Sequence, residues 1–259
     1  MTTQIEIPDS FPRGGDVRGK RVVVTGASRG LGRLLAHAFA RAGALLTLVA
    51  RTERDLKAVA DELDGPALVC AGDVTDADFN ASVASATVAE WGGLDVWICN
   101  AGISPVVGGP LDIDPAVWCA VLDVNLTGSF LGARAAARVM KPGGRILFTG
   151  SVLGERPRAG LSAYSASKAG LVGLAKGLAL DLAPAGITVN VVAPGWFDSP
   201  LAEGWMQNPA LAAEIVDHTP QRRWGRNTDL AGAYQFLASD AAAFVTGSVL
   251  NVDGGYLLA

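Results

Sequence analysis

Short apolar segments alternate with amphipathic ones along most of the chain. Seven apolar or β-branched segments are typical of strands buried on both faces, and they cover residues 21–25, 45–50, 67–71, 94–99, 145–149, 188–192 and 248–252. Between them lie segments with apolar residues at helical spacing, at residues 29–42, 52–63, 76–91, 114–140, 163–182 and 229–239. A helix that joins two parallel strands must cover one face of their sheet. The pattern therefore predicts an α/β fold, a doubly wound parallel sheet of about seven strands with helices on both faces.

The domain organisation follows from the same pattern. The 259 residues fit one large α/β domain, which we place at residues 19–259. Residues 1–18 carry several charges and no apolar run, which predicts a polar N-terminal arm and no secretory signal. The longest irregular stretch is 195–227. Because long loops in compact domains often cover a binding site, we expect a lid near residues 196–226.

Composition and charge exclude several classes of protein. The net charge is −4 and no basic stripe is evident, so we expect no nucleic-acid partner. Charged residues and prolines interrupt the longest apolar runs, so we expect no membrane span. Cys70, Cys99 and Cys119 have no CxxC spacing. We interpret them as reduced core thiols of a cytoplasmic protein, and we expect no metal site.

A glycine-rich turn joins the first predicted strand to the first predicted helix. Residues 25–32 read Thr-Gly-Ala-Ser-Arg-Gly-Leu-Gly, a GxxxGxG spacing. Glycines let a backbone approach a pyrophosphate, and a helix N-terminus supplies N–H donors and a positive dipole. The turn therefore indicates a dinucleotide site. The alternative is a turn whose glycines serve only tight helix packing.

A second motif carries acid–base chemistry. Tyr164 and Lys168 stand four residues apart, so on a helix they face the same way. A lysine ammonium beside a phenol favours the phenolate and is expected to lower the tyrosine pKa, which would make Tyr164 a usable acid or base. Ser151 follows the strand 145–149, at the sheet edge where ligand crevices lie, and its hydroxyl is suited to donate to a carbonyl.

Together with further segments, these motifs resemble the short-chain dehydrogenase/reductase superfamily. The resemblance is to its compact single-domain, Rossmann-type branch, which includes enzymes of the 3-oxoacyl-carrier-protein reductase and gluconate 5-dehydrogenase kinds. It covers residues 19–256 and rests on the turn 25–32, Asp73-Val74, Cys99-Asn100-Ala101-Gly102, Asn125, Ser151, Tyr164, Lys168, Pro194-Gly195, and the segments 244–247 and 252–255. It implies that residues 19–259 form a dinucleotide-binding and catalytic domain.

The resemblance implies a role for each matching residue. Tyr164 is the general acid in reduction and the base in oxidation, Lys168 lowers its pKa and binds the nicotinamide ribose, Ser151 polarises the carbonyl, and Asn125 supports a water in a proton relay. The residues implied to bind the cofactor are Gly26, Ser28, Arg29, Gly30, Leu31, Gly32, Arg51, Asp73, Val74, Asn100, Ala101, Gly102, Tyr164, Lys168, Pro194, Gly195, Phe197 and Ser199. The chain departs from the family pattern at Cys99, where the family has Asn, and at Phe197 and Ser199, where it has Ile and Thr.

The end of the second strand bears on the choice of nicotinamide cofactor. NAD enzymes usually place a carboxylate there for the ribose 2′-hydroxyl, but this strand ends in Ala50 and Arg51. Arg29 and Arg51 would suit a 2′-phosphate. The sequence therefore favours NADP(H), while Glu53 keeps NAD(H) possible, and both arginines have surface exposure as the alternative.

Substrate contacts are expected from the loops that follow the strands. An apolar and aromatic wall is predicted from Ser104, Val152, Leu153, Trp196, Trp205 and Met206. Such a wall favours a bulky hydrophobic ketone or secondary alcohol. Arg156 and Arg158 would instead suit a carboxylate or a sugar acid, although surface exposure is the simpler interpretation. His37 and His218 are expected to be structural and surface residues.

Several functions remain open at this point. The leading hypothesis is an NADP(H)-dependent oxidoreductase of ketones and secondary alcohols, with a sugar acid or a 3-oxoacyl thioester as alternative substrates. A non-catalytic nucleotide-binding regulator would not need Asn125, Ser151, Tyr164 and Lys168 together. A sugar-nucleotide epimerase shares the YxxxK motif but needs a larger C-terminal region. The resemblance also implies a homotetramer, with helices 114–140 and 163–182 at one interface.

Overall fold

One parallel sheet forms the centre of the protein. The computed structural model describes residues 14–104, 107–109, 111–199 and 201–259. Within them, seven strands follow the order β3-β2-β1-β4-β5-β6-β7, and every pairing is parallel. The strands are β1 (Arg21–Thr25), β2 (Leu45–Ala50), β3 (Ala67–Ala71), β4 (Val96–Cys99), β5 (Arg145–Thr149), β6 (Thr188–Pro194) and β7 (Val249–Val252). The predicted doubly wound α/β fold is confirmed.

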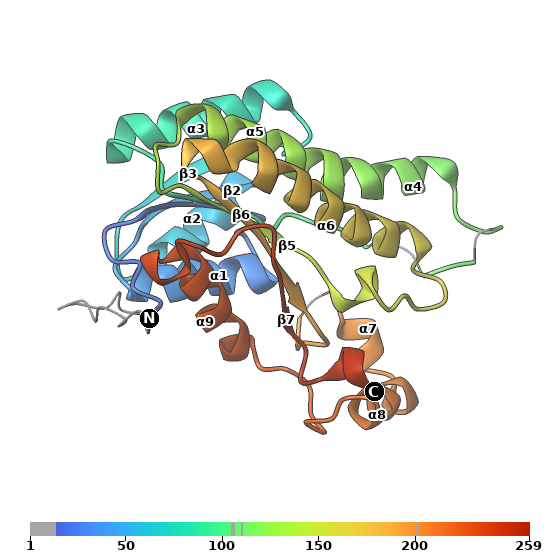
Figure 1. The fold of residues 1–259 in the computed structure, drawn as a ribbon. Helices are drawn as coiled ribbons and strands as arrows, with labels where there is room; N and C mark the ends of the chain where they lie inside the picture. The colour runs from blue at the N-terminus through green and yellow to red at the C-terminus, as the bar shows by residue number, and fades with distance from the viewer. Residues whose placement is uncertain (1–13, 105–106, 110, 200) are drawn as a thin grey trace, which may run out of the picture.

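Helices cover both faces of the sheet (Figure 1). On one face lie α1 (Gly30–Arg41), α2 (Glu53–Asp61) and α9 (Asn227–Ala238), and on the other lie α3 (Ala77–Trp91), α4 (Pro115–Leu122), α5 (Gly128–Val139) and α6 (Ser162–Leu182). Each face has its own apolar core, as alternating strand side chains require. Val22 and Val24 pack towards α1, and Val23 packs towards α3.

The structure corrects several details of the sequence prediction. The predicted irregular stretch 195–227 contains two helices, α7 (Glu203–Met206) and α8 (Pro209–Asp217). The stretch 114–140 is helical, but a π-helical turn at Asp123–Thr127 separates α4 from α5. Val17 is fully buried in the core, so the folded domain begins inside the predicted N-terminal arm. Residues 1–13 of that arm lie outside the described residues.

The α4–α5 stretch is the one segment of the described residues that is long and apolar enough to be a candidate membrane span. By length and composition alone, Pro115–Val139 could cross a membrane, with a mean hydropathy of 1.4 over its most apolar window. In the fold this stretch packs against α3 and α6, and Ala133 and Ala136 are fully buried. A core helix of an α/β domain satisfies the same criteria, so this is weak evidence for a membrane span.

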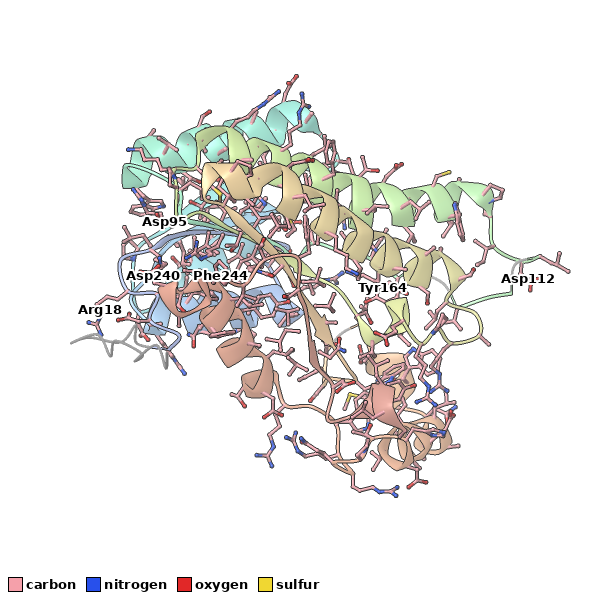
Figure 2. The ribbon with its side chains drawn as sticks, in the orientation of Figure 1. Arg18, Asp95, Asp112, Tyr164, Asp240 and Phe244 are labelled. Carbon is pink, nitrogen blue, oxygen red and sulfur yellow. The ribbon has the colours of Figure 1, made fainter. Side chains whose placement is uncertain are left out.

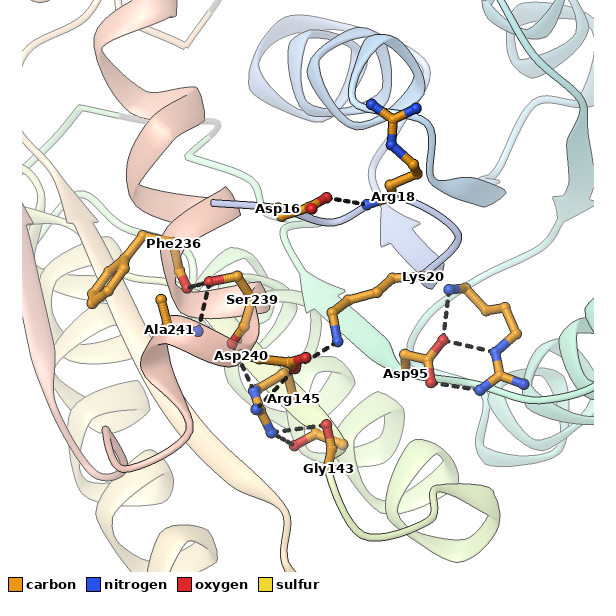
Figure 3. Close-up of polar contacts among 12 residues, drawn as sticks. Asp16, Arg18, Lys20, Asp95, Gly143, Arg145, Phe236, Ser239, Asp240 and Ala241 are labelled. Atoms are coloured by element: carbon orange, nitrogen blue, oxygen red, sulfur yellow. Dashed lines mark hydrogen bonds and ion pairs between the residues drawn. The ribbon is translucent and has the colours of Figure 1, made fainter. Parts of the chain in front are cut away.

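Charged residues hold the edge of the sheet where the strands begin (Figure 3). Arg145, 3% exposed at the start of β5, donates to the carbonyl oxygens of Gly143, Gly144 and Ser239. Arg21, at the start of β1, donates from its backbone N–H and from Nε to Asp95 Oδ2, at 2.8 and 2.7 Å. These contacts join the strand starts at this edge of the sheet.

Replacing Asp95 with asparagine is expected to lower the free energy of unfolding by about 1–2 kcal/mol at neutral pH. Partial burial raises the pKa of Asp95, but the hydrogen bonds from Arg21 outweigh it and hold the pKa below its ordinary value. The stabilisation is therefore present above the unfolded pKa of about 4 and is lost as the pH falls through the lower folded value.

Urea unfolding of both proteins between about pH 2 and 7 measures this effect. The difference between wild type and Asp95→Asn should be largest at neutral pH and should vanish in acid. Asp64→Asn is the matched control, because Asp64 and Arg41 are 3.8 Å apart and both are highly exposed. A control that loses as much stability as Asp95→Asn would contradict the prediction.

Candidate active site

A cleft opens at the edge where the strands end. Its cavity of about 500 Å³ lies where β1, β4, β5 and β6 reach their carboxyl ends, the edge at which doubly wound folds bind ligands. Every residue predicted to bind the cofactor lines it: Gly26, Ser28, Arg29, Gly30, Leu31, Gly32, Arg51, Asp73, Val74, Asn100, Ala101, Gly102, Tyr164, Lys168, Pro194, Gly195, Phe197 and Ser199. Residues far apart in the sequence therefore meet in one cavity.

The glycines in the turn between β1 and α1 let neighbouring parts of the backbone pack closely together. Gly26 has a φ of +68°, a conformation that favours glycine, and a Cβ there would lie 2.9 Å from Ala101 Cα. A Cβ on Gly32 would lie 2.1 Å from the Gly26 carbonyl oxygen. Both glycines are therefore required by contacts within the chain, as the packing interpretation of the turn expects, and the dinucleotide interpretation stays a prediction. No side chain of the described residues caps the N-terminus of α1.

Asn100 ties the glycine turn to the end of β4. Its Nδ2 donates to the Thr25 carbonyl oxygen at 2.9 Å. The Thr25 hydroxyl accepts from the backbone N–H groups of Asn100 and Ala101, at 2.9 and 3.0 Å. The strand ends that border the cavity are thus fixed by short polar contacts that only folding creates.

The predicted acid–base residues lie together in the cavity. Tyr164 and Lys168 lie in the first two turns of α6, with Lys168 Nζ 5.5 Å from the centre of the Tyr164 ring. Ser151 follows β5, and its Oγ accepts from the Leu153 N–H at 3.1 Å. Figure 2 shows Tyr164 on the side of the molecule that carries α7 and α8, away from Asp95 and Asp240.

Burial controls the protonation of both α6 side chains. Burial raises the pKa of Tyr164 to about 12, and the nearby Ser151 hydroxyl opposes that shift. Burial lowers the pKa of Lys168 to about 8. The expected lowering of the Tyr164 pKa by Lys168 is not seen, since burial raises this pKa instead, and the lysine ammonium group donates to the Thr149 carbonyl oxygen at 2.8 Å. Tyr164 is therefore a protonated donor at neutral pH.

Asn125 lies beside the cavity and is fully buried. It sits in the π-helical turn, a feature that often marks functional sites. Its Nδ2 donates to the Ile103 carbonyl oxygen and to Ser167 Oγ, both at 3.0 Å, and its Oδ1 accepts from the Ile103 N–H at 2.8 Å. Both amide hydrogens are thus used within the chain, and the side chain fastens the loop after β4 to α6.

The other end of the cavity is apolar and aromatic. Ser104, Val152, Leu153, Trp196 and Trp205 line it, as the sequence predicted. Met206 does not, so that prediction was wrong. The short helix α7 turns Trp205 inward and Met206 to a second groove against α1, near His37. Leu161, Leu201 and Ala202 complete the wall and were missed, because apolar loop residues carry no distinctive sequence signal.

Arg156 and Arg158 are committed to contacts within the chain. Arg158 lies over the rings of Trp205 and Trp196, at 4.9 and 5.6 Å, and donates to Glu214 at 2.9 Å. Arg156 lies 5.1 Å from the Tyr256 ring centre and donates to the carbonyl oxygens of Tyr256 and Ala259. The expectation of plain surface exposure was wrong for both, and neither lines the cavity.

The smaller sequence interpretations had mixed outcomes. All three cysteines are free, but only Cys99 is buried, whereas Cys70 is half-buried and Cys119 is exposed. His37 lies 3.1 Å from Glu62 on the α1 surface, and His218 Nδ1 lies 2.9 Å from the Glu214 carbonyl oxygen. Among the described residues, no group of acidic, histidine or cysteine side chains is arranged to hold a metal ion.

The far end of the cavity carries exposed charges. Arg29 and Arg51 line it, and among the described residues neither has a carboxylate within ion-pair distance. Glu53, the carboxylate that kept NAD(H) possible, pairs instead with Lys57 at 2.7 Å. Asp55 also lines this end and was missed, because it lies inside the predicted helix rather than at the strand end.

Comparison with known proteins agrees with this geometry. A family model described as enoyl-(acyl carrier protein) reductase matches residues 26–257. The chain is 39% identical to cis-4-hydroxycyclohexanecarboxylate dehydrogenase of Sinomonas cyclohexanicum, over 93% of this chain and 98% of that one. It is 38% identical to 3-oxoacyl-(acyl-carrier-protein) reductase of Escherichia coli, over 92% and 97% of the two chains. A short-chain dehydrogenase structure from Burkholderia cenocepacia in complex with NADP has a TM-score of 0.86 at 34% identity, over 93% and 99%.

Fold, cavity and relatives together define a nicotinamide-dependent oxidoreductase that acts on CH–OH or C=O groups. The chain belongs to the short-chain dehydrogenase/reductase family, in the branch that contains the 3-oxoacyl reductases. The glycine turn, the uncapped helix N-terminus and the long cavity fit a nicotinamide dinucleotide.

Proposed function

We propose that the protein is an NADP(H)-dependent oxidoreductase that interconverts a bulky hydrophobic ketone and its secondary alcohol. The observation that carries the proposal is the single cavity that joins the glycine turn, the side chains of Ser151, Tyr164 and Lys168, and an apolar aromatic wall. The nicotinamide, when bound, supplies or accepts the hydride. The chain's own residues hold the substrate carbonyl and move the proton.

Each polar residue has one proposed task. In reduction, the Tyr164 hydroxyl gives its proton to the substrate carbonyl oxygen and becomes a phenolate, and in oxidation the phenolate form takes the proton from the alcohol. The Ser151 hydroxyl donates to the same oxygen and so stabilises the charge that develops on it. Lys168, whose ammonium group donates to the Thr149 carbonyl oxygen, would bind the cofactor ribose. Asn125 holds the loop at Ile103 beside Lys168, and any water of the proton relay would lie next to it.

The distribution of charges along the cavity supports both the proposed cofactor, NADP(H), and the proposed neutral substrate. Arg29 and Arg51 lie at the nucleotide end, where a 2′-phosphate would bind. At the substrate end, no described lining residue beyond Lys168 carries a charge, and Arg156 and Arg158 are paired elsewhere. A buried carboxylate needs a partner, so a neutral substrate fits this end better than a sugar acid.

The lid and the assembly are further parts of the proposal. Leu201, Ala202 and Trp205 border the cavity from the segment before and within α7, which supports a lid at 196–226. On α6, Gly173 and Gly177 have open space beside them and Leu180 is 79% exposed, which supports packing against another copy of the chain in a homotetramer. The free cysteines support a cytoplasmic location.

A panel of ketones and alcohols, each run with NADPH and with NADH, tests the proposed function. Alicyclic and aryl ketones should turn over with NADPH, and 4-oxocyclohexanecarboxylate should be reduced much more slowly than cyclohexanone because the cavity offers its carboxylate no free cation. Equal or faster turnover of the acid would contradict the neutral-substrate proposal. Light scattering of the same protein checks the assembly.

A further inference from the structure

A series of buried and partly buried hydrogen bonds runs across the strand ends at the active site. It begins at Tyr234, a fully buried residue of α9 whose hydroxyl lies 2.8 Å from Thr149 Oγ1. Thr149 Oγ1 donates onward to Asn100 Oδ1 at 3.3 Å. Asn100 Nδ2 then donates to the carbonyl oxygen of Thr25, the residue before Gly26. No motif pointed to Tyr234, which stands 66 residues after Lys168 in an ordinary amphipathic helix.

The donor and acceptor of each of these three hydrogen bonds follow from the chemistry of the groups involved. The Thr25 carbonyl oxygen can only accept, so the amide nitrogen of Asn100 faces it and the amide oxygen faces Thr149. That amide oxygen can only accept, so the Thr149 hydroxyl must donate to it. The proton between Thr149 and Tyr234 therefore belongs to Tyr234, which is the donor that starts the series. Burial raises the pKa of Tyr234, which keeps it protonated.

Thr149 connects the two layers of the fold. Its side chain contacts Tyr234 of α9 on one face of the sheet, and its carbonyl oxygen accepts from Lys168 Nζ of α6, which covers the other face (Figure 1). One residue thus fixes the acceptor of the lysine and, through Asn100, the start of the glycine turn. Cβ atoms on Gly26 and Gly32 would lie only 3.1 and 2.7 Å from Asn100 Nδ2, so this amide is in close contact with the turn.

We propose that Tyr234 is a positioning residue for the reaction: through Thr149 it holds both the carbonyl oxygen that Lys168 uses and the glycine turn that would bind the cofactor pyrophosphate. The inference rests on the proposed function, since it assigns Tyr234 to the same site. Tyr234 does not line the cavity, so it acts only through Thr149 and Asn100.

Tyr234→Phe removes one hydroxyl and keeps the ring. We expect kcat to fall and the KM for NADPH to rise, with kcat/KM lower by about fivefold, the factor that corresponds to one ordinary hydrogen bond. Thr87→Val is the matched control. Thr87 is also fully buried and donates within the chain, but it joins α3 to β2 away from the cavity. The control should lose comparable thermal stability and keep wild-type kcat and KM.

A double-mutant cycle with Thr149→Val separates positioning from general destabilisation. Thr149→Val leaves the Tyr234 hydroxyl buried without its acceptor, so adding Tyr234→Phe should restore part of the melting temperature and cost no further activity. Losses in kcat/KM that multiply, or a Tyr234→Phe enzyme with the kinetics of Thr87→Val, would overturn the inference alone. A wild-type protein that turns over no ketone with either nicotinamide would overturn the proposed function and this inference with it.

Discussion

Tyr164→Phe is expected to reduce turnover by about 10²–10⁴-fold, the usual contribution of a general acid. In the proposed mechanism the hydroxyl is the proton donor, it lies beside Ser151 in the cavity, and its raised pKa of about 12 keeps the proton on the phenol at neutral pH. Phenylalanine preserves the ring, its packing and the position of Lys168, so cofactor affinity should stay close to that of the wild type.

Steady-state kinetics with the best ketone of the panel, together with tryptophan-fluorescence titration by NADPH, measures both halves of this expectation. Tyr256→Phe is the matched control, because Tyr256 is buried among Trp196 and Arg156 but lies outside the cavity lining. It should keep most of the activity. Normal turnover by Tyr164→Phe would remove the central residue of the proposed mechanism.

Replacing both Arg29 and Arg51 with alanine is expected to raise the KM for NADPH by about 10–100-fold, and to leave the KM for NADH nearly unchanged. The two guanidinium groups line the nucleotide end of the cavity, where the only extra group that NADPH presents is its 2′-phosphate. A charged hydrogen bond is worth about 1.5–3 kcal/mol, and exposure of both side chains reduces that value.

The measurement is a comparison of the two cofactors in single and double variants at fixed ionic strength. Arg54→Ala is the matched control, since Arg54 is a neighbouring exposed arginine that does not line the cavity. It should change neither KM. If wild-type turnover is faster with NADH, or if the KM values for NADPH and NADH rise equally in the double variant, the two arginines do not recognise the 2′-phosphate.

The sheet and its layers were predictable because burial imposes a local pattern. Strands buried on both faces must be continuously apolar, and the 21–25 and 145–149 segments showed this directly. The π-helical turn at Asp123–Thr127 was not predictable, because the segment contains no glycine or proline that would mark a change in the helix. Helices α7 and α8 were missed for a related reason, since α7 has only four residues and α8 nine, too few to show a period reliably.

The contacts that individual side chains make were harder to predict than the positions of the helices and strands. Arg158 looked like a surface cation, and only folding brings the faces of Trp196 and Trp205 and the carboxylate of Glu214 around it. Met206 follows Trp205 directly, yet the orientation of α7 sends the two side chains to different grooves. Neither outcome is encoded in spacing along the chain.

By itself, the sequence determined the parallel α/β fold, the glycine turn, the four-residue spacing of Tyr164 and Lys168, and the family, because each of these depends on local periodicity or on a fixed motif. The tertiary structure decided how protons and charges are distributed. It buried Tyr164 and Lys168, which shifted both pKa values, and it placed the lysine ammonium group within hydrogen-bond distance of the Thr149 carbonyl oxygen. It also placed Tyr234 of α9 against Thr149. Burial and hydrogen bonding are properties of residues brought together from distant segments, so only the folded chain defines them.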